Sequence, residues 1–207
     1  MNLYQKYECL TVCEPAITAA ISAIVGCYRN GGKVLVCGNG GSAADGAHIV
    51  GELLKGFLLK RPLNAEMKTK LLYANAEFGE LCAEMLQGSL PAVDLAAMQS
   101  IISAVANDTA PALVYAQQVM GLGKPGDILI GISTSGNAAN VMCAGVAAKS
   151  LGLTTIALIG QSGGKMRELF DININVPATE TVDIQELHLP VYHAICAAVE
   201  KEIFGNG

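Results

Sequence analysis

Two ionisable side chains, His48 and Glu52, lie four residues apart in the segment VLVCGNGGSAADGAHIVGEL, residues 34–53. If the segment is helical after its glycines, the two side chains share one face of the helix. An imidazole and a carboxylate on one face can act as an acid–base pair or bind a metal ion. The turn GNGGSA, which precedes them, lets the backbone approach an anion and points helix N-terminal amides at it.

A second polar loop places Ser133, Thr134 and Ser135 directly after the apolar segment DILIGIS and before a predicted helix. Three consecutive hydroxyls at a helix N-terminus offer three donors beside free backbone amides, which suits phosphate. A structural turn would need only one capping residue. In an open parallel sheet both loops lie at the carboxyl ends of strands, where ligands bind. The two loops together predict a phosphate site.

The last predicted helix carries Gln185, Glu186, His188 and His193. A histidine and an amide from it, combined with the HxxxE pair, could bind zinc through nitrogen and oxygen while leaving room for substrate. Gln185 and His193 are eight residues apart, roughly 12 Å along a helix axis. Both can bind one metal ion only if their side chains extend toward each other along the helix. Pro190 could kink the helix there, because it has no N–H to donate to the carbonyl of Glu186.

The strands and helices expected around these residues indicate a doubly wound α/β fold, in which helices flank a parallel sheet. Continuously apolar strands, typical of buried parallel sheets, are expected at residues 33–38, 90–95, 127–133, 154–160 and 172–177. Helical patterns separate these strands. We expect a single domain over residues 1–207, with an N-terminal helix within 1–30 and a longer, mainly helical segment near 61–106.

Composition narrows the class of protein. A net charge of −5 argues against broad nucleic-acid binding, although backbone amides can hold a phosphate without any lysine. The seven cysteines are scattered without a CxxC motif, which favours buried thiols in a reducing compartment over disulfides. The N-terminus lacks a signal-peptide pattern, and no apolar run reaches the roughly 18 residues of a membrane helix. We expect a soluble, cytoplasmic protein with no membrane partner.

The first loop has two alternative interpretations. GNGGSA fits the loose dinucleotide fingerprint GxGxx(G/A), which also requires an acidic residue about 20 positions later to hold a ribose. That position falls near LLKRPL, and the next candidate, Asp94, comes too late. A nicotinamide or flavin site is therefore disfavoured, and a tight turn without a ligand is the remaining alternative to a phosphate site.

Taken together, these motifs resemble the phosphoheptose isomerases of the SIS (sugar isomerase) family. CGNGGSAADGAHIVGEL, GDILIGISTSGNAANV, GGKM and IQELHLPVYHAICAAVEKEIF carry the resemblance and occur in family order. It implies the SIS domain, a flavodoxin-like three-layer sandwich, in a homotetramer whose sites are shared between subunits. It also implies an aldose–ketose isomerase acting on a phosphorylated sugar, in the first place sedoheptulose 7-phosphate, giving glycero-manno-heptose 7-phosphate.

By position, the resemblance also implies roles for individual residues. Glu52 and His193 would be the acid–base pair. Zinc, present in some members, would be bound by His48, Glu52, Gln185 and His193. Its presence is conditional, because Glu52 cannot easily be both a tight ligand and a free base. Substrate would contact Asn39, Gly40, Gly41, Glu52, Asn107, Asp108, Ser133, Thr134, Ser135 and Gln185. The chemistry of the first loop itself adds Ser42, whose hydroxyl could bond a phosphate or a sugar hydroxyl.

Three features depart from the family pattern. Ala138 stands where members usually have a serine, so one phosphate hydroxyl is missing; the segment 61–106 is longer than in the typical isomerase, and Pro190 is unusual. The rival interpretation is a non-catalytic SIS protein, either a sugar-phosphate sensor or a replication-initiator-associating protein. The presence of all four candidate zinc ligands favours the enzyme, because a binding module does not need them all.

Overall fold

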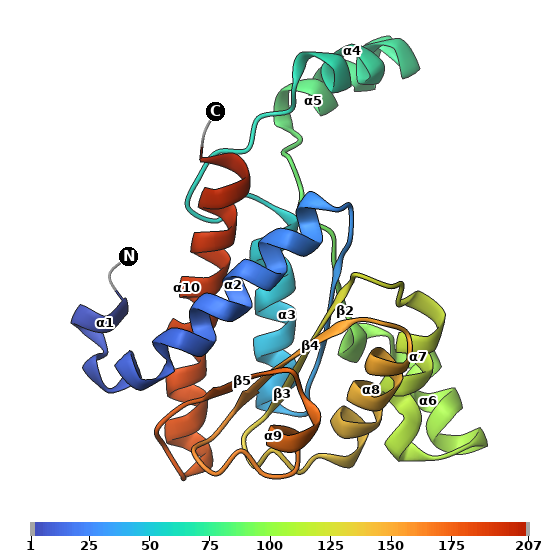
Figure 1. Ribbon diagram of the computed structural model, residues 1–207. Coiled ribbons are helices and arrows are strands. Elements are labelled where there is room, and N and C mark those ends of the chain that lie inside the picture. Colours follow the sequence, from blue (N-terminus) through green and yellow to red (C-terminus); the bar gives the residue numbers. More distant parts are fainter. Residues whose placement is uncertain (1–2, 206–207) are drawn as a thin grey trace.

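A parallel sheet forms the centre of the computed structural model, which describes residues 3–205 (Figure 1). Among these residues it has five strands in the order β2-β1-β3-β4-β5. This is the flavodoxin-like doubly wound order, so the predicted fold class is confirmed. The strands are β1 (Val34–Cys37), β2 (Ala92–Asp94), β3 (Ile128–Ser133), β4 (Thr154–Ile159) and β5 (Ile172–Asn175).

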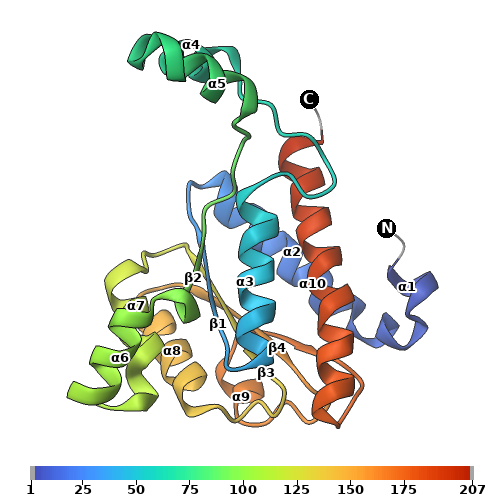
Figure 2. The ribbon, with the colours of Figure 1, turned by 180° about the vertical axis from the view of Figure 1, so that it is seen from behind.

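Helices cover both faces of the sheet, as the view from behind shows (Figure 2). One face carries α2 (Glu14–Arg29), α3 (Gly41–Leu54) and α10 (Thr181–Phe204), and the other carries α6 (Gln99–Asp108), α7 (Val114–Leu122) and α8 (Ala139–Ser150). Strand β1 shows why the strands are apolar throughout. Val34 and Val36 belong to the core on the first face, whereas Leu35 and Cys37 belong to the core on the second.

A helical hairpin, here called the arm, projects away from the sheet (Figure 1). It consists of α4 (Ala65–Ala74) and α5 (Ala76–Met85), within the segment predicted to be mainly helical. Asn64 and Asn75 cap the two helices by accepting hydrogen bonds from the backbone amides of Met67 and Phe78. None of the residues of α4 is buried, so the arm has little contact with the rest of its own chain.

The remaining elements are short, and they connect the layers. They are α1 (Leu3–Lys6), η1 (Glu8–Cys13), η2 (Leu95–Ala97), η3 (Pro111–Leu113) and α9 (Met166–Leu169). The continuous stretch Glu8–Arg29, made of η1 and α2, is long and apolar enough to cross a membrane by length and composition alone. Its residues Ile17, Ile24 and Val25 are buried in the core beneath α10, so we assign it to the core of the domain.

All seven cysteines are free thiols, and Cys13, Cys27, Cys37 and Cys196 are buried. Burial raises the pKa of Cys13 and of Cys27 to about 11. Their thiols are therefore protonated at neutral pH and are weak nucleophiles. The prediction of buried thiols without disulfides is confirmed for these four.

Candidate active site

The first loop, between β1 and α3, is fixed by side chains from the opposite helical layer. Asn39 and Asn140 exchange two amide hydrogen bonds of 2.9 Å each. The Tyr115 hydroxyl donates to the Gly38 carbonyl at 2.5 Å. Gly40, which precedes α3, has a φ of 54°, a conformation that favours glycine. These contacts fix the conformation of the loop at the N-terminus of α3, the kind of position at which anions bind.

Gly41 marks the closest approach of α10 to this loop. A Cβ atom at Gly41 would lie 2.3 Å from Nε2 of Gln185, so the absence of a side chain makes room for this amide. Ser42 is only 4% exposed, whereas Asn39, Gly40 and Gly41 are exposed. Of the predicted substrate contacts in this loop, Ser42 is thus the least accessible.

The second loop contributes to a pocket of about 240 Å³. Thr134 and Ser135 line this pocket, while Ser133 is buried at the end of β3 with 7% of its surface exposed. Ala138 occupies the N-cap of α8 and provides no side-chain hydrogen bond there. The other lining residues are Asn137, Gly160, Gln161, Ser162, Ala178, Thr179 and Ile184.

Gln161, Ser162 and Thr179 are polar lining residues that the sequence analysis missed. Gln161 and Ser162 follow β4 directly, in the sequence GQSGG. This polar turn at the carboxyl end of a parallel strand was the signal that could have found them.

The acid–base candidates meet between α3 and α10. Nε2 of His48 lies 3.1 Å from Oε1 of Glu52 and 3.4 Å from Nε2 of His193. The Phe57 ring packs against His193 at 5.3 Å between centroids. The His48 side chain is 41% exposed and that of Glu52 is 14% exposed. The structure therefore brings Glu52 and His193 together around a partly exposed His48.

The electrostatics of this cluster suit proton transfer. Burial, reinforced by the neighbouring His48, lowers the pKa of His193 against the opposing effect of Glu52, so its imidazole is neutral at pH 7. Oε2 of Glu52 is buried and has no hydrogen-bond partner among the described residues. Nζ of Lys55 lies 3.9 Å from this oxygen, so the carboxylate stands between His48 and Lys55.

Three further residues lie behind His48, on the side of the core. The Tyr192 hydroxyl is 2.9 Å from Nδ1 of His48 and 3.4 Å from Oδ1 of Asp45. His188 is fully buried, with Nδ1 at 4.0 Å from Oδ2 of Asp45. Burial lowers the pKa of His188 to about 4, against the smaller opposing effect of the backbone at Ile159. His188 is therefore separate from the accessible cluster.

The donor atoms of the cluster are of the types that zinc binds, but the set is not assembled in the single chain. With bonds of about 2.0–2.1 Å, neighbouring ligands of a tetrahedral zinc lie roughly 3.3 Å apart, close to both separations measured from His48. Gln185 lies instead at Gly41, roughly two turns earlier along α3. In the described chain no group of three or more His, Cys, Asp or Glu side chains is placed to hold a metal ion.

Asn107 and Asp108 lie at the end of α6, where Nδ2 of Asn107 donates to Oδ1 of Asp108 at 2.8 Å. Both are exposed. Within residues 3–205, no other side-chain hydrogen bond or ion pair of theirs joins them to the remaining site residues. The single chain therefore does not connect them to the cluster around His48.

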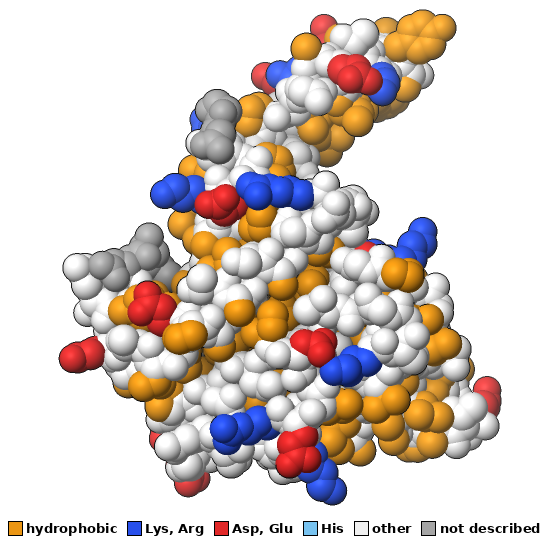
Figure 3. Space-filling view, in the orientation of Figure 1, with side chains coloured by type: hydrophobic (Ala, Val, Ile, Leu, Met, Phe, Trp, Pro, Cys, Tyr) orange, Lys and Arg blue, Asp and Glu red, His pale blue; other side chains and the backbone are white. Residues whose placement is uncertain are grey.

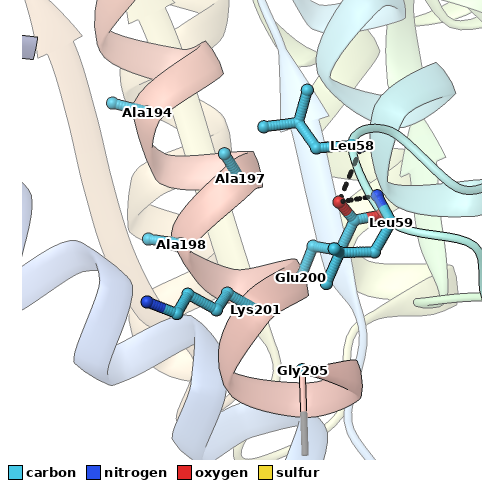
Figure 4. A pocket seen from close by; sticks show the side chains of 8 residues that line it. All are labelled: Leu58, Leu59, Ala194, Ala197, Ala198, Glu200, Lys201 and Gly205. Carbon is cyan, nitrogen blue, oxygen red and sulfur yellow. Dashed lines mark hydrogen bonds between the residues drawn. The ribbon is translucent and has the colours of Figure 1, made fainter. Parts of the chain in front are cut away.

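The segment after α3 is fastened to α10 by a buried ion pair of Arg61 and Glu200. The Glu200 carboxylate accepts hydrogen bonds from the amide of Phe57 and from Nε of Arg61, both at 2.8 Å. It also accepts from the amides of Leu58 and Leu59 at 2.8 and 2.9 Å (Figure 4). Burial opposes ionisation of Glu200, but these donors lower its pKa below the usual range. Arg61 also donates to the carbonyl of Glu52 at 3.0 Å, so the pair holds the end of α3 in place.

Comparison with known proteins decides the family. The sequence model of the SIS domain matches residues 8–72 and 83–160. A phosphoheptose isomerase of Rhodospirillum rubrum is 39% identical over 191 residues, which cover 92% of this chain and 88% of that protein. The chain belongs to the phosphoheptose isomerase family of SIS-domain proteins. The gap between the two matched stretches, residues 73–82, falls within the arm.

Two solved phosphoheptose isomerases have the same fold. The protein from Neisseria gonorrhoeae matches with a TM-score of 0.75 at 34% identity, over 95% of this chain and 91% of that chain. The protein from Francisella tularensis matches with a TM-score of 0.78 at 34% identity and the same coverage. The predicted resemblance to phosphoheptose isomerases is thus confirmed over nearly the whole chain.

Proposed function

We propose that the protein is an aldose–ketose isomerase that converts sedoheptulose 7-phosphate into glycero-manno-heptose 7-phosphate. The observation that carries this proposal is the cluster of His48, Glu52 and His193 between α3 and α10. Both helices also reach the loops suited to phosphate, since α3 begins at Gly41 and Ile184 of α10 lines the pocket of the second loop. The relatives named phosphoheptose isomerase, similar over most of their length, support the same reaction. A sensor or a replication-associated protein would bind a sugar phosphate without needing an acid–base pair.

The mechanism needs a base and a proton carrier on the same side of the bound sugar. Glu52 removes the proton from the carbon next to the carbonyl, and the electron pair forms the enediol double bond. His193 carries a proton between the two oxygens, and Glu52 returns its proton to the neighbouring carbon. Backbone amides of the first loop and the hydroxyls of Thr134 and Ser135 would hold the phosphate.

Zinc is a conditional part of this proposal. His48, Glu52, Gln185 and His193 would hold the ion after Gln185 moves away from Gly41. A bound zinc would polarise the sugar carbonyl. Titration of chelator-treated protein with zinc, followed by calorimetry, tests it: we expect binding at one ion per site, which His48→Ala abolishes. Equal binding by the variant would refute this ligand set.

We also propose a cytoplasmic homotetramer in which the arm packs on another subunit. Figure 3 shows hydrophobic side chains over the arm, where Tyr73, Phe78 and Leu81 are 94%, 64% and 61% exposed. Such a surface usually requires a partner. A neighbouring subunit could then complete the site with Asn107 and Asp108. Light scattering should find a tetramer that Phe78→Glu dissociates; a monomeric wild type would refute the proposal.

The decisive experiment follows conversion of sedoheptulose 7-phosphate to the aldose by wild-type protein and by Glu52→Gln. We expect turnover only in the wild type, with thermal stabilisation by the sugar phosphate in both proteins. Unchanged turnover in Glu52→Gln would refute the assignment of the base. Stabilisation of the wild type without any conversion would instead favour the sensor.

A further inference from the structure

A groove of about 420 Å³ runs along the outer side of α10 (Figure 4). Its floor is formed by Ala194, Ala197 and Ala198, which lie three and four residues apart and therefore share one face of the helix. The exposed side chains of Leu58 and Leu59 line its other side. Short side chains on a helix allow a second helix to pack closely against it. The groove is thus apolar and shaped to receive a helix.

One end of this groove adjoins the acid–base cluster. Ala194 directly follows His193, and Leu58 directly follows Phe57, whose ring packs on His193 at 5.3 Å between centroids. The other end is at Gly205, eleven residues further along the chain, or roughly 16 Å along a helix axis. A helix seated in the groove would therefore lie next to His193.

The arm carries a helix of matching length with an uncovered apolar face. Helix α5 has ten residues, so it is roughly 15 Å long. Its side chains Phe78, Leu81 and Met85 share one face and are 61–65% exposed. Gly79 and Ala83, which are buried, lie on a different face, toward α4. The apolar face of α5 is therefore available to a partner.

The charges of α5 and of the groove are complementary. Next to its apolar face α5 carries Glu77, Glu80 and Glu84, and it has no lysine or arginine. Lys201 lines the groove, and Lys60 follows its lining residues in the chain. Within residues 3–205 none of these five side chains has an ion-pair partner. An acidic helix is thus attracted to a basic groove.

The arm of a chain does not lie in the groove of the same chain. It extends past the C-terminal end of α10 in both ribbon views (Figures 1 and 2). The base of the arm is held in this direction by a bridge between Pro62 and Gln87 and by a hydrogen bond from the Gly88 amide to the Arg61 carbonyl. Helix α5 therefore reaches such a groove only on another copy.

We propose that α5 of a second copy of this chain docks in the groove along α10 and closes the acid–base cluster on that side. Its apolar face packs on the alanines and on Leu58, and its glutamates face Lys60 and Lys201. The copy that donates the arm thereby supplies part of the wall of a site that a single chain leaves partly exposed. Closure excludes water from the cluster during the reaction, a consequence that rests on the proposed function.

The first test changes the groove and leaves the arm intact. Ala197→Glu occupies the floor of the groove and places a negative charge against the acidic α5. We expect it to weaken self-association about tenfold or more, as measured by light scattering on dilution. Val146→Glu is the matched control, because Val146 is 57% exposed on α8, on the opposite face of the sheet. Equal association of the two variants would overturn the proposal.

The second test mixes two variants that are damaged in different places. Phe78→Glu has a damaged arm and an intact groove, whereas Ala197→Glu has an intact arm and a damaged groove. Because the arm of one copy docks in the groove of another, an equimolar mixture should form larger assemblies than either variant alone. A mixture whose assemblies are no larger than those of its components would overturn the proposal, and so would a monomeric wild type.

Turnover of sedoheptulose 7-phosphate measures the effect of docking on the site. We expect kcat/KM to fall about tenfold or more in Ala197→Glu, to recover in part in the mixture, and to stay unchanged in Val146→Glu. Unchanged turnover in a dissociated Ala197→Glu would refute closure of the cluster by the arm. A wild type that assembles as expected but converts no sugar would instead refute the proposed function, so the two failures are distinguishable.

Discussion

Removing the Glu200 carboxylate should both destabilise the protein and displace its proposed catalytic base, Glu52. In Glu200→Ala, the buried guanidinium of Arg61 loses its counter-charge and three backbone amides lose their acceptor. Breaking a fully buried pair from one side costs about 3–5 kcal/mol. In a domain of this size, that cost corresponds to a fall in Tm on the order of 6–20 °C.

Thermal and urea unfolding measure this effect, with Glu202→Ala as the matched control. Glu202 lies two residues further along α10 and pairs with Arg29 at 3.4 Å, but both side chains are more than half exposed. An exposed pair contributes about 0–1 kcal/mol, so this variant should unfold almost like the wild type. Because Arg61 donates to the Glu52 carbonyl, Glu200→Ala should also lower kcat, whereas Glu202→Ala should not.

A double variant distinguishes the buried ion pair from simple loss of packing. Arg61→Met combined with Glu200→Leu removes both charges and keeps apolar volume, so it should recover part of the stability lost in Glu200→Ala. Equal unfolding midpoints for Glu200→Ala and Glu202→Ala would refute the reasoning. A double variant that loses as much stability as the two single substitutions lose in sum would also refute the reasoning.

Two further predictions concern His188 and Gly136. Because the pKa of His188 is about 4 in the folded protein and about 6.5 when unfolded, the unfolded chain binds more protons between these values. The free energy of unfolding should fall by up to about 3 kcal/mol as the pH drops from 6.5 toward 4. Urea unfolding at several pH values should show that this free energy depends less steeply on pH in His188→Gln than in the wild type. An equal dependence in both proteins would contradict the low pKa of His188. Gly136 has a φ of 64°, and a Cβ there would lie 2.0 Å from the Gly163 carbonyl oxygen. Gly136→Ala should lower Tm and raise KM. Gly121→Ala, in open space on α7, should leave KM unchanged and should not lower Tm, because alanine favours a helix more than glycine does. Equal behaviour of the two variants would contradict this prediction.

The sequence was sufficient for the fold class because the relevant patterns are local. A strand such as 128–133, buried on both faces, is apolar up to its last residue, Ser133, and helices connect the parallel strands. The pairing of His48 with Glu52 follows from helical geometry alone, since residues four apart share a face. The approach of His193 to this pair followed from the family resemblance and not from any local pattern.

The tertiary structure decided the contacts between α3 and α10, whose residues are about 140 positions apart in the chain. No periodicity specifies how two helices are rotated and shifted against each other, because side-chain packing on both surfaces sets that geometry. This packing placed Tyr192 behind His48 and Gln185 against Gly41. Sequence therefore determined which chemical groups the protein has and which strand ends and helix faces carry them, whereas helix packing determined which groups meet.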